Sequence, residues 1–226
     1  MRRRLAVLGT VLVLAVAAWF AAPLALSQLK FFRVRQIEVT GLRYLSPALV
    51  LARVEIEPDR NTFESLGEIE RRAEQVPGIL SARVVRRLPG TLRLDLAEEP
   101  PVAFAPGEKG LVPLDVDAHP LPYDPSVTGF DLPVVERPEP VLTRTLATIR
   151  LAEPQLFDLV DGVRLEQGRT VVLELGGHRV LLRNDPMPAE IRALEIVRWH
   201  LTQNAVPFSQ LDARFDGWVV VRRGGT

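Results

Sequence analysis

The chain has 226 residues, with 28 basic and 28 acidic side chains, three histidines and no cysteine. A chain of this length forms one or two domains, and its 47% hydrophobic content is enough to bury a core, which excludes wholesale disorder. The lack of cysteine excludes a disulfide framework, thiolate metal sites and a cysteine nucleophile. A formal net charge of zero argues against a nucleic-acid-binding protein, which needs a positive excess to neutralise phosphates.

The first 26 residues have the pattern of a membrane anchor. Arg2, Arg3 and Arg4 form a basic stub at 1–4, and an uncharged run at 5–26 follows it. As a helix this run would span roughly 33 Å, enough for a bilayer core of about 30 Å. Because positive residues stay in the cytoplasm, the three arginines predict that the rest of the chain is exported. A cleaved signal peptide is the alternative, but its apolar region usually has about 7–15 residues, so we favour a retained signal anchor.

The segment that follows predicts a compact α+β unit with the element order β-α-α-β-β. Strands are indicated by apolar and polar residues in alternation, clearest at Leu92, Leu94 and Leu96, and helices by an apolar residue every three or four positions. The predicted elements are a strand at 34–39, helices at 48–54 and 66–75, and strands at 80–88 and 91–98.

Three local signals set the boundaries inside this unit. Ser46-Pro47 predicts the start of the first helix, because serine caps free N–H groups and proline suits the first helical position. Charged residues between Glu64 and Glu74 predict a solvated face on the second helix. Pro89-Gly90 predicts a tight turn in which proline presets the first φ angle and glycine accepts a positive second one.

A proline-rich stretch separates this unit from a second, β-rich part. Ten of the 19 prolines lie between residues 98 and 140, so only short strands are expected there, at 102–104 and 111–114. Asp115 to Ala118 suggests a turn in which the Asp115 side chain bonds nearby backbone N–H groups. Regular elements return afterwards, and they are predicted as helices at 141–151 and 188–201 and strands at 162–166, 170–175, 180–183, 208–214 and 218–222.

A search for catalytic chemistry finds no constellation. His119, His178 and His200 are far apart in the sequence, and no phosphate loop, nucleophile elbow or metal motif is present. The carboxylate pairs Glu98-Glu99 and Asp115 with Asp117 are of a kind common in ordinary turns and strand ends. We therefore expect no enzyme, no metal site and no cofactor. The alternative hypothesis of a membrane-anchored hydrolase is opposed by the missing catalytic residues.

The large aromatic residues near the end of the chain allow two interpretations. Trp199 follows Ile196 by three positions on the last helix, and we expect it in the core. Trp218 begins a short run, Trp218-Val219-Val220-Val221, that is apolar on both faces. Such a strand is either a central core strand or an edge strand whose open side receives another chain, because an exposed apolar edge promotes aggregation unless a partner fills it.

The order of these features resembles the FtsQ/DivIB family of bacterial cell-division proteins, whose β-α-α-β-β unit is a POTRA domain. Several short segments carry the resemblance, and it covers essentially the whole chain. They are 34–41 (VRQIEVTG), Ser46-Pro47, Val76-Pro77-Gly78-Ile79, Arg87 to Leu92 (RLPGTL), Glu98 with Pro101 and Ala103 in an E-x-x-P-x-A pattern, 211–215 (LDARF) and 219–222 (VVVR).

Two segments depart from the family pattern. The family usually has an Asp-x-x-Gly turn, and Asp115 to Ala118 places alanine where that glycine stands. Glu136, after Leu132 to Val135, also occupies a position where glycine is common. The two ends of the chain therefore carry the resemblance more strongly than the middle.

The resemblance implies a non-enzymatic scaffold in the cell membrane at the division septum, with its N-terminus cytoplasmic and its C-terminus outside the cytoplasm. It divides the chain into a POTRA domain at 32–101 and a β domain at 102–223. Members of the family bind single-span proteins of the FtsB and FtsL type through a terminal edge strand, and other division proteins through the POTRA domain and the membrane span. Carried over to this chain, the partner-binding residues are Arg214, Phe215, Trp218, Val219, Val220, Val221 and Arg222. A POTRA-bearing export or outer-membrane assembly factor is the alternative.

Overall fold

A computed structural model describes residues 12, 19, 30–57, 61–62, 65–167 and 169–224. The chain divides into two compact parts, the N-terminal unit at 1–98 and the C-terminal unit at 99–226. Apart from Leu12 and Trp19, the apolar run predicted as a membrane anchor lies outside the described residues, as do Arg2, Arg3 and Arg4. Among the described residues, no helix has the length and apolar character that crossing a membrane requires.

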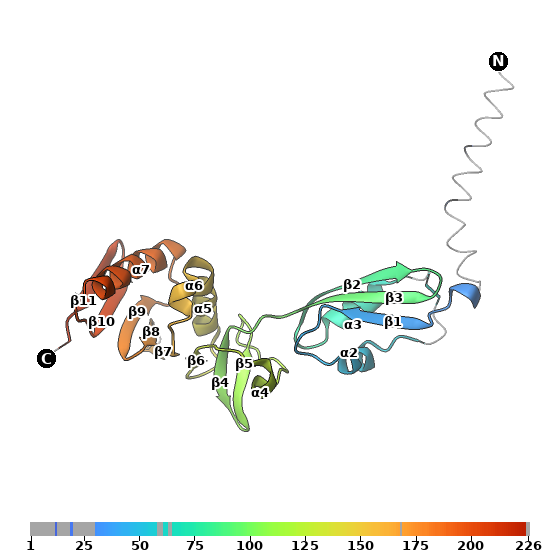
Figure 1. Ribbon diagram of the computed structural model, residues 1–226, viewed down its shortest axis with the longest axis horizontal. Helices are drawn as coiled ribbons and strands as arrows, with labels where there is room; N and C mark the ends of the chain where they lie inside the picture. Colours follow the sequence, from blue (N-terminus) through green and yellow to red (C-terminus); the bar gives the residue numbers. More distant parts are fainter. Residues whose placement is uncertain are drawn as a thin grey trace, which may run out of the picture. The chain divides into compact units, whose positions relative to one another are not determined.

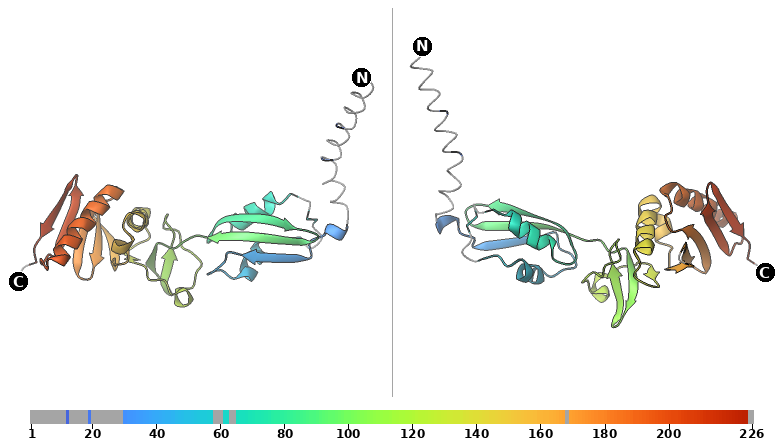
Figure 2. Two further views of the ribbon diagram at one scale, coloured as in Figure 1. Left: turned by 45° about the horizontal axis from the view of Figure 1, so that its top comes forward. Right: turned by 180° about the vertical axis from the view of Figure 1, so that it is seen from behind.

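The N-terminal unit has the predicted element order (Figure 1). After a short 3-10 turn at Lys30–Phe32, its elements are β1 (Gln36–Thr40), α2 (Pro47–Val54), α3 (Gly67–Glu74), β2 (Ile79–Arg87) and β3 (Thr91–Glu98). β3 is the central strand, parallel to β1 and antiparallel to β2. Figure 2 shows α3 lying over the face of this sheet that is turned away in Figure 1.

The core of the N-terminal unit comes from the residues that the sequence pattern selects. Leu92, Leu94 and Leu96 of β3 are buried, which confirms the alternation. They belong to the same core as Ile69 and Ala73, which lie one turn apart on α3. Burying one such leucine side chain contributes about 1.5–3 kcal/mol to stability, so this small sheet depends on the apolar stripe of its helices.

Two of the predicted local signals act differently in the structure. Ser46 has the extended backbone of a helix cap and Pro47 begins α2, but the Ser46 side chain makes no capping hydrogen bond. The turn expected at Pro89-Gly90 is wrong in type, because Leu88–Pro89 is a cis peptide and Gly90 has no positive φ. Gly90 is needed for space instead, since a Cβ atom there would lie 2.6 Å from the carbonyl oxygen of Arg33.

The C-terminal unit is built on one eight-stranded sheet with the order β11-β10-β9-β8-β7-β6-β4-β5 (Figure 1). Its strands are β4 (Ala103–Gly107), β5 (Gly110–Leu114), β6 (Val134–Val135), β7 (Gly162–Glu166), β8 (Thr170–Leu175), β9 (His178–Arg183), β10 (Gln210–Phe215) and β11 (Trp218–Arg222). The helices are α4 (Pro125–Thr128), α5 (Pro140–Ala152), α6 (Pro154–Phe157) and α7 (Pro188–Gln203). The proline-rich stretch holds only short elements, as its composition predicts.

One face of this sheet carries the core of the C-terminal unit. Leu146 of α5, Leu156 of α6 and Leu194 of α7 pack with the buried side chains of the strands, such as Leu173 and Leu211. The other face carries charged pairs, in which Arg164 bonds the carboxylates of Glu166 and Glu174. The unit therefore has an apolar helical layer on one side, and on the other side charged pairs beside the buried Val172 and Leu181.

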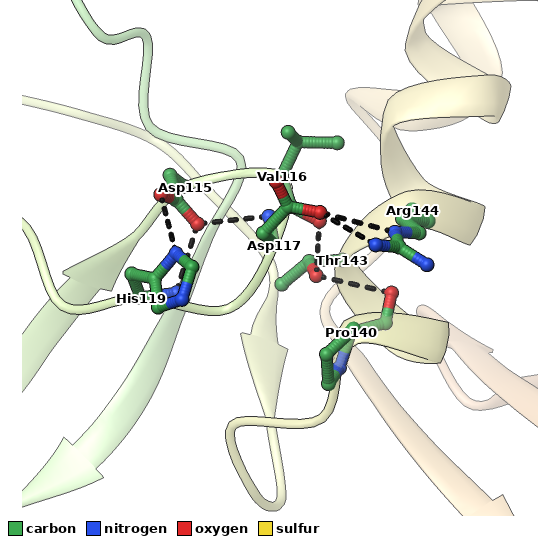
Figure 3. Close-up of polar contacts among 7 residues, drawn as sticks. All are labelled: Asp115, Val116, Asp117, His119, Pro140, Thr143 and Arg144. Carbon is green, nitrogen blue, oxygen red and sulfur yellow. Dashed lines mark hydrogen bonds and ion pairs between the residues drawn. The ribbon is translucent and has the colours of Figure 1, made fainter.

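The turn after β5 is locked onto the start of α5 (Figure 3). Asp115 accepts hydrogen bonds from the backbone N–H groups of Asp117 and His119, both at 2.8 Å, which confirms the predicted turn. The Asp117 carboxylate accepts two hydrogen bonds from Arg144, and the Thr143 hydroxyl donates to the carbonyl of Val116 at 2.8 Å. This turn also contains Ala118 at φ +63°, the left-handed conformation that the family's glycine would adopt without strain.

We expect Ala118→Gly to stabilise the C-terminal unit by about 0.5–1 kcal/mol, because glycine removes the steric cost of the left-handed backbone. Urea denaturation of the full chain in detergent measures the change. The matched control is Ala147→Gly within α5, which should cost about 1 kcal/mol. Equal effects of the two substitutions would contradict a strained backbone at position 118.

Two neighbouring glutamates at the boundary between the units behave in opposite ways. Glu98 ends β3 and accepts hydrogen bonds from three successive backbone N–H groups, those of Arg43, Tyr44 and Leu45, at 2.7–3.1 Å. Burial raises the pKa of Glu99, and the negative charges of Asp115 and Asp117 raise it further. Glu98 thus ties β3 to the start of α2, whereas the charge on Glu99 opposes folding.

We expect Glu98→Gln to destabilise the N-terminal unit by about 1.5–3 kcal/mol, the usual value of a hydrogen bond to a charged group.

Glu99→Gln should change the folding stability in the opposite direction. A raised folded-state pKa means that Glu99 favours folding while it is protonated and that this contribution is lost as pH rises through that pKa. Glu99→Gln should therefore stabilise at pH 7 and have little effect below about pH 4. Denaturation curves at both pH values would contradict this assignment if both substitutions destabilised at pH 7.

Candidate protein-binding edge

β11 lies at one end of the eight-stranded sheet. It pairs antiparallel with β10 in the register Leu211 to Val221 and Asp212 to Val220, and no other described strand pairs with it. The sequence left a central core strand and an edge strand open as interpretations of this segment. The structure decides for the edge strand.

The apolar run of β11 divides between two environments. Val219 and Val221 are half-buried and pack against the core. Trp218 and Val220 point the other way, with 76% and 51% of their surface exposed. Phe215, across the turn from Trp218 in the β10–β11 register, is also exposed. The alternation of side chains along a strand thus gives β11 one face for the core and one apolar face that this chain leaves uncovered.

Arg214 is held by an ion pair inside β10. Its guanidinium donates two hydrogen bonds to Asp212, at 2.8 and 2.6 Å, and a longer one to the hydroxyl of Thr170. The hydrogen bond from Arg214 keeps the pKa of Asp212 below its usual range, despite the opposing effect of burial. The pairing register of β10 and β11 also shifts between Asp212 and Phe215. Arg214 therefore shapes the strand beside the edge, while Arg222 is the exposed cation on β11 itself.

A small cavity of about 150 Å³ adjoins the edge, between the first half of α7 and the β10–β11 turn. Ala189 and Ala193 form its helical side, and Phe215, Trp218 and Val219 form its strand side. Sequence reasoning missed this cavity. Its signal is two alanines four positions apart, which lie on one helix face and leave room beside the strand.

The β10–β11 turn is fixed by one arginine. Arg183 on β9 donates to Asp216 in the turn at 2.9 Å and to Glu190 on α7 at 2.8 Å. Glu190 also accepts a hydrogen bond from the backbone N–H of Met187, which caps the start of α7. These contacts hold the cavity walls and the start of β11 in a defined arrangement.

Two of the other edge strands, β5 and β2, carry structural covers, and β1 is the remaining edge strand. The segment after β5 folds back on that strand, where Leu121 N–H bonds the carbonyl of Pro113 and Leu114 bridges Pro120. On β2, the backbone N–H of Val84 donates to Glu70 of α3 at 2.8 Å. A longer contact of the same kind, at 3.4 Å, joins Ala82 to Glu74.

α3 can cover the edge of β2 because the spacing of its glutamates matches the spacing of alternate residues on the strand. Residues four apart on a helix rise about 6 Å, close to the roughly 6.6 Å between alternate residues of a strand. Glu70 and Glu74 can therefore reach alternate N–H groups of β2. The solvated face predicted for this helix is confirmed at Glu68, Arg71 and Glu74, which are exposed. Glu70 departs from it, because it is half-buried and bonded to the strand, and Glu64 lies outside the described residues.

The remaining residues singled out by sequence lie apart from one another. His119 contacts Asp115 at 3.2 Å, His178 stacks on Phe208, and His200 is exposed on α7. Among the described residues no group of three or more histidines or acids is placed to hold a metal ion. The core position predicted for Trp199 is wrong, because its side chain is 57% exposed. The helix turns Ile191 and Leu194 toward the sheet instead, which leaves Trp199 on the outer side.

A sheet of three strands with two helices, β-α-α-β-β, defines a POTRA-type module, and residues 32–99 match the family described as POTRA domain, FtsQ-type. The chain is also 28% identical over 243 residues to a protein named Cell division protein FtsQ from Myxococcus fulvus (strain ATCC BAA-855 / HW-1). That alignment covers 97% of this chain and 84% of the relative. The chain is therefore similar to cell-division proteins of the FtsQ/DivIB family and contains an FtsQ-type POTRA domain. The family is generally non-enzymatic.

We expect Glu70→Ala to uncover the β2 edge. The Val84 N–H would lose its carboxylate acceptor, which should cost about 1–3 kcal/mol and speed hydrogen exchange along β2. Glu68→Ala is the matched control, because Glu68 lies on the same helix and its carboxylate bonds Arg72. Hydrogen exchange of the full chain, read by mass spectrometry, measures both variants. Unchanged exchange in β2 after Glu70→Ala would show that α3 does not protect this edge.

Proposed function

We propose that this chain is a single-span scaffold of the bacterial divisome, without enzymatic activity, that links early and late division proteins at the septum. Its N-terminus lies in the cytoplasm and its two folded units lie outside. It binds single-span division proteins of the FtsB and FtsL type through β11. The similarity to an FtsQ cell-division protein and the exposed edge at Trp218–Arg222 support this proposal.

The edge strand is the main support for this proposal, because its backbone can give a partner affinity and its side chains can give selectivity. A partner segment that adds a strand to β11 would bond the backbone of Trp218–Arg222. Side chains of Trp218, Val220 and Arg222 would meet alternate side chains of that segment on one face. The adjoining cavity lined by Ala193 and Phe215 is open to an apolar side chain of the same partner.

Other division proteins would bind the N-terminal unit and the membrane span. An export or outer-membrane assembly factor remains the alternative role for a POTRA-bearing chain. The cell-division name of the relative, which aligns with 97% of this chain, favours the divisome.

We expect Trp218→Asp and Val220→Asp each to weaken partner binding by about 2 kcal/mol or more, which is about 30-fold in Kd. Both side chains are exposed, so the fold should tolerate the change, whereas a buried unpaired charge at the interface is costly. Pull-down of FtsB and FtsL type partners and complementation of septum formation measure the effect. Trp199→Asp is the control, since it places the same charge at an exposed tryptophan on α7. Normal binding by both β11 variants would refute the edge-strand function.

The absence of cysteine allows a second readout of the same prediction. Single cysteines placed at every second position of β11 should form disulfides with cysteines in the partner segment, because strand side chains alternate between two faces. Positions 218, 220 and 222 should then react as one set. Crosslinking without this period would indicate that the partner binds in another way.

A further inference from the structure

One end of the N-terminal unit joins the β2–β3 turn to the segment that enters β1. The carbonyl of Gly90 accepts hydrogen bonds from the N–H groups of Arg35 and Gln36, at 2.7 and 3.2 Å. The N–H of Thr62 donates to the carbonyl of Phe32 at 2.9 Å, which adds the loop after α2. These bonds hold the turn and the entering segment together as one surface, which we call the entry surface.

Two large apolar side chains project from the entry surface. Phe31 is 59% exposed and Leu88, next to the turn, is 58% exposed. Arg35 holds the backbone of Phe31 through a hydrogen bond to its carbonyl, and the Arg35 guanidinium lies 5.8 Å from the centre of the Phe31 ring. The exposed position of Phe31 is therefore supported by defined contacts.

Four exposed arginines surround these apolar side chains. They are Arg33, Arg35, Arg86 and Arg87. Glu38 lies 3.6 Å from Arg87, and Arg33 and Arg86 have interaction partners of their own. Arg86 is directed along the surface by its hydrogen bond to the carbonyl of Thr62. Apolar side chains within a cationic rim are the pattern of surfaces that bind anionic membrane interfaces.

The sequence places this surface next to the proposed membrane span. The apolar run ends at Leu26, four positions before Lys30. Four residues reach at most about 14 Å, and the headgroup region is roughly 5–8 Å thick on each side of the hydrocarbon core. The arginines at 33 and 35 follow within a few residues, so they start close to the lipid phosphates.

We propose that the entry surface binds the extracytoplasmic leaflet of the membrane, with Phe31 and Leu88 in the headgroup region and Arg35 and Arg87 on lipid phosphates. This inference rests on the proposed single-span topology. It gives the N-terminal unit a second attachment to the bilayer besides the chain itself. It also accounts for the exposed side chain of Leu88 next to the turn.

The test compares two leucines of equal exposure near opposite ends of the same strand. Leu88→Cys and Leu80→Cys each introduce the single cysteine of the chain, and both leucines are 58% exposed. They are eight positions apart, or about 26 Å along an extended chain. Each full-length variant carries an environment-sensitive fluorophore and is reconstituted in vesicles that contain phosphatidylglycerol. Lipids with a nitroxide near the headgroup serve as quenchers.

We expect a blue-shifted emission and strong quenching for the label at position 88, and neither for the label at position 80. Arg35→Gln with Arg87→Gln should reduce the quenching at 88, and so should high salt, because the Debye length falls from about 10 Å at 0.1 M to about 3 Å at 1 M. Equal signals at 88 and 80 would overturn the inference. Shielding of position 88 that persists in detergent and rises with protein concentration would also overturn it, because a second copy would then cover this surface.

Flotation after an alkaline wash and pull-down of the partner are measured on the same samples. A chain that floats and binds its partner, but shows equal signals at 88 and 80, refutes only the membrane contact. A chain that does not float refutes the single-span topology and this inference together.

Discussion

Strands at the edge of a sheet expose backbone N–H and C=O groups that need partners, and the arrangement of this molecule depends on how each edge is treated. In the N-terminal unit, glutamates of α3 reach the N–H groups of β2. In the C-terminal unit, the segment after β5 folds back on that strand. β11 has one described neighbour, β10, and exposes Trp218 and Val220 beside its edge. β11 therefore differs from the covered β2 and β5 edges, and its exposed apolar side chains are the reason why we propose that the partner binds there.

The acidic residues of the chain are largely engaged in holding backbone and arginine groups. Glu98 accepts three amide hydrogen bonds, and Asp115 organises a turn in the same manner (Figure 3). Glu190 and Asp216 both bond Arg183, which fixes the turn before β11. Carboxylates used in this way position loops and strand ends. They give the molecule rigid surfaces, which is what a binding scaffold requires.

Both proposed surfaces follow one physical design. At β11 and at the entry surface, exposed apolar side chains lie beside arginines on a backbone that neighbouring hydrogen bonds hold in place. The two differ in what the backbone offers. β11 presents an unpaired strand edge, which suits another polypeptide, whereas the entry surface presents a closed turn with a cationic rim, which suits lipid phosphates.

The sequence by itself determined the order of the elements and the buried faces of most of them. Leu92, Leu94 and Leu96 had to lie on one face of a strand, and β7, β8 and β11 have the predicted bounds, because local periodicity and turn residues act over a few positions. Only the tertiary structure decided which strands became edges, that Trp199 faces outward, and that Glu70 bonds β2. Each of these depends on residues far apart in the chain, and a side chain's own neighbours in sequence do not specify which distant strand or helix will pack against it.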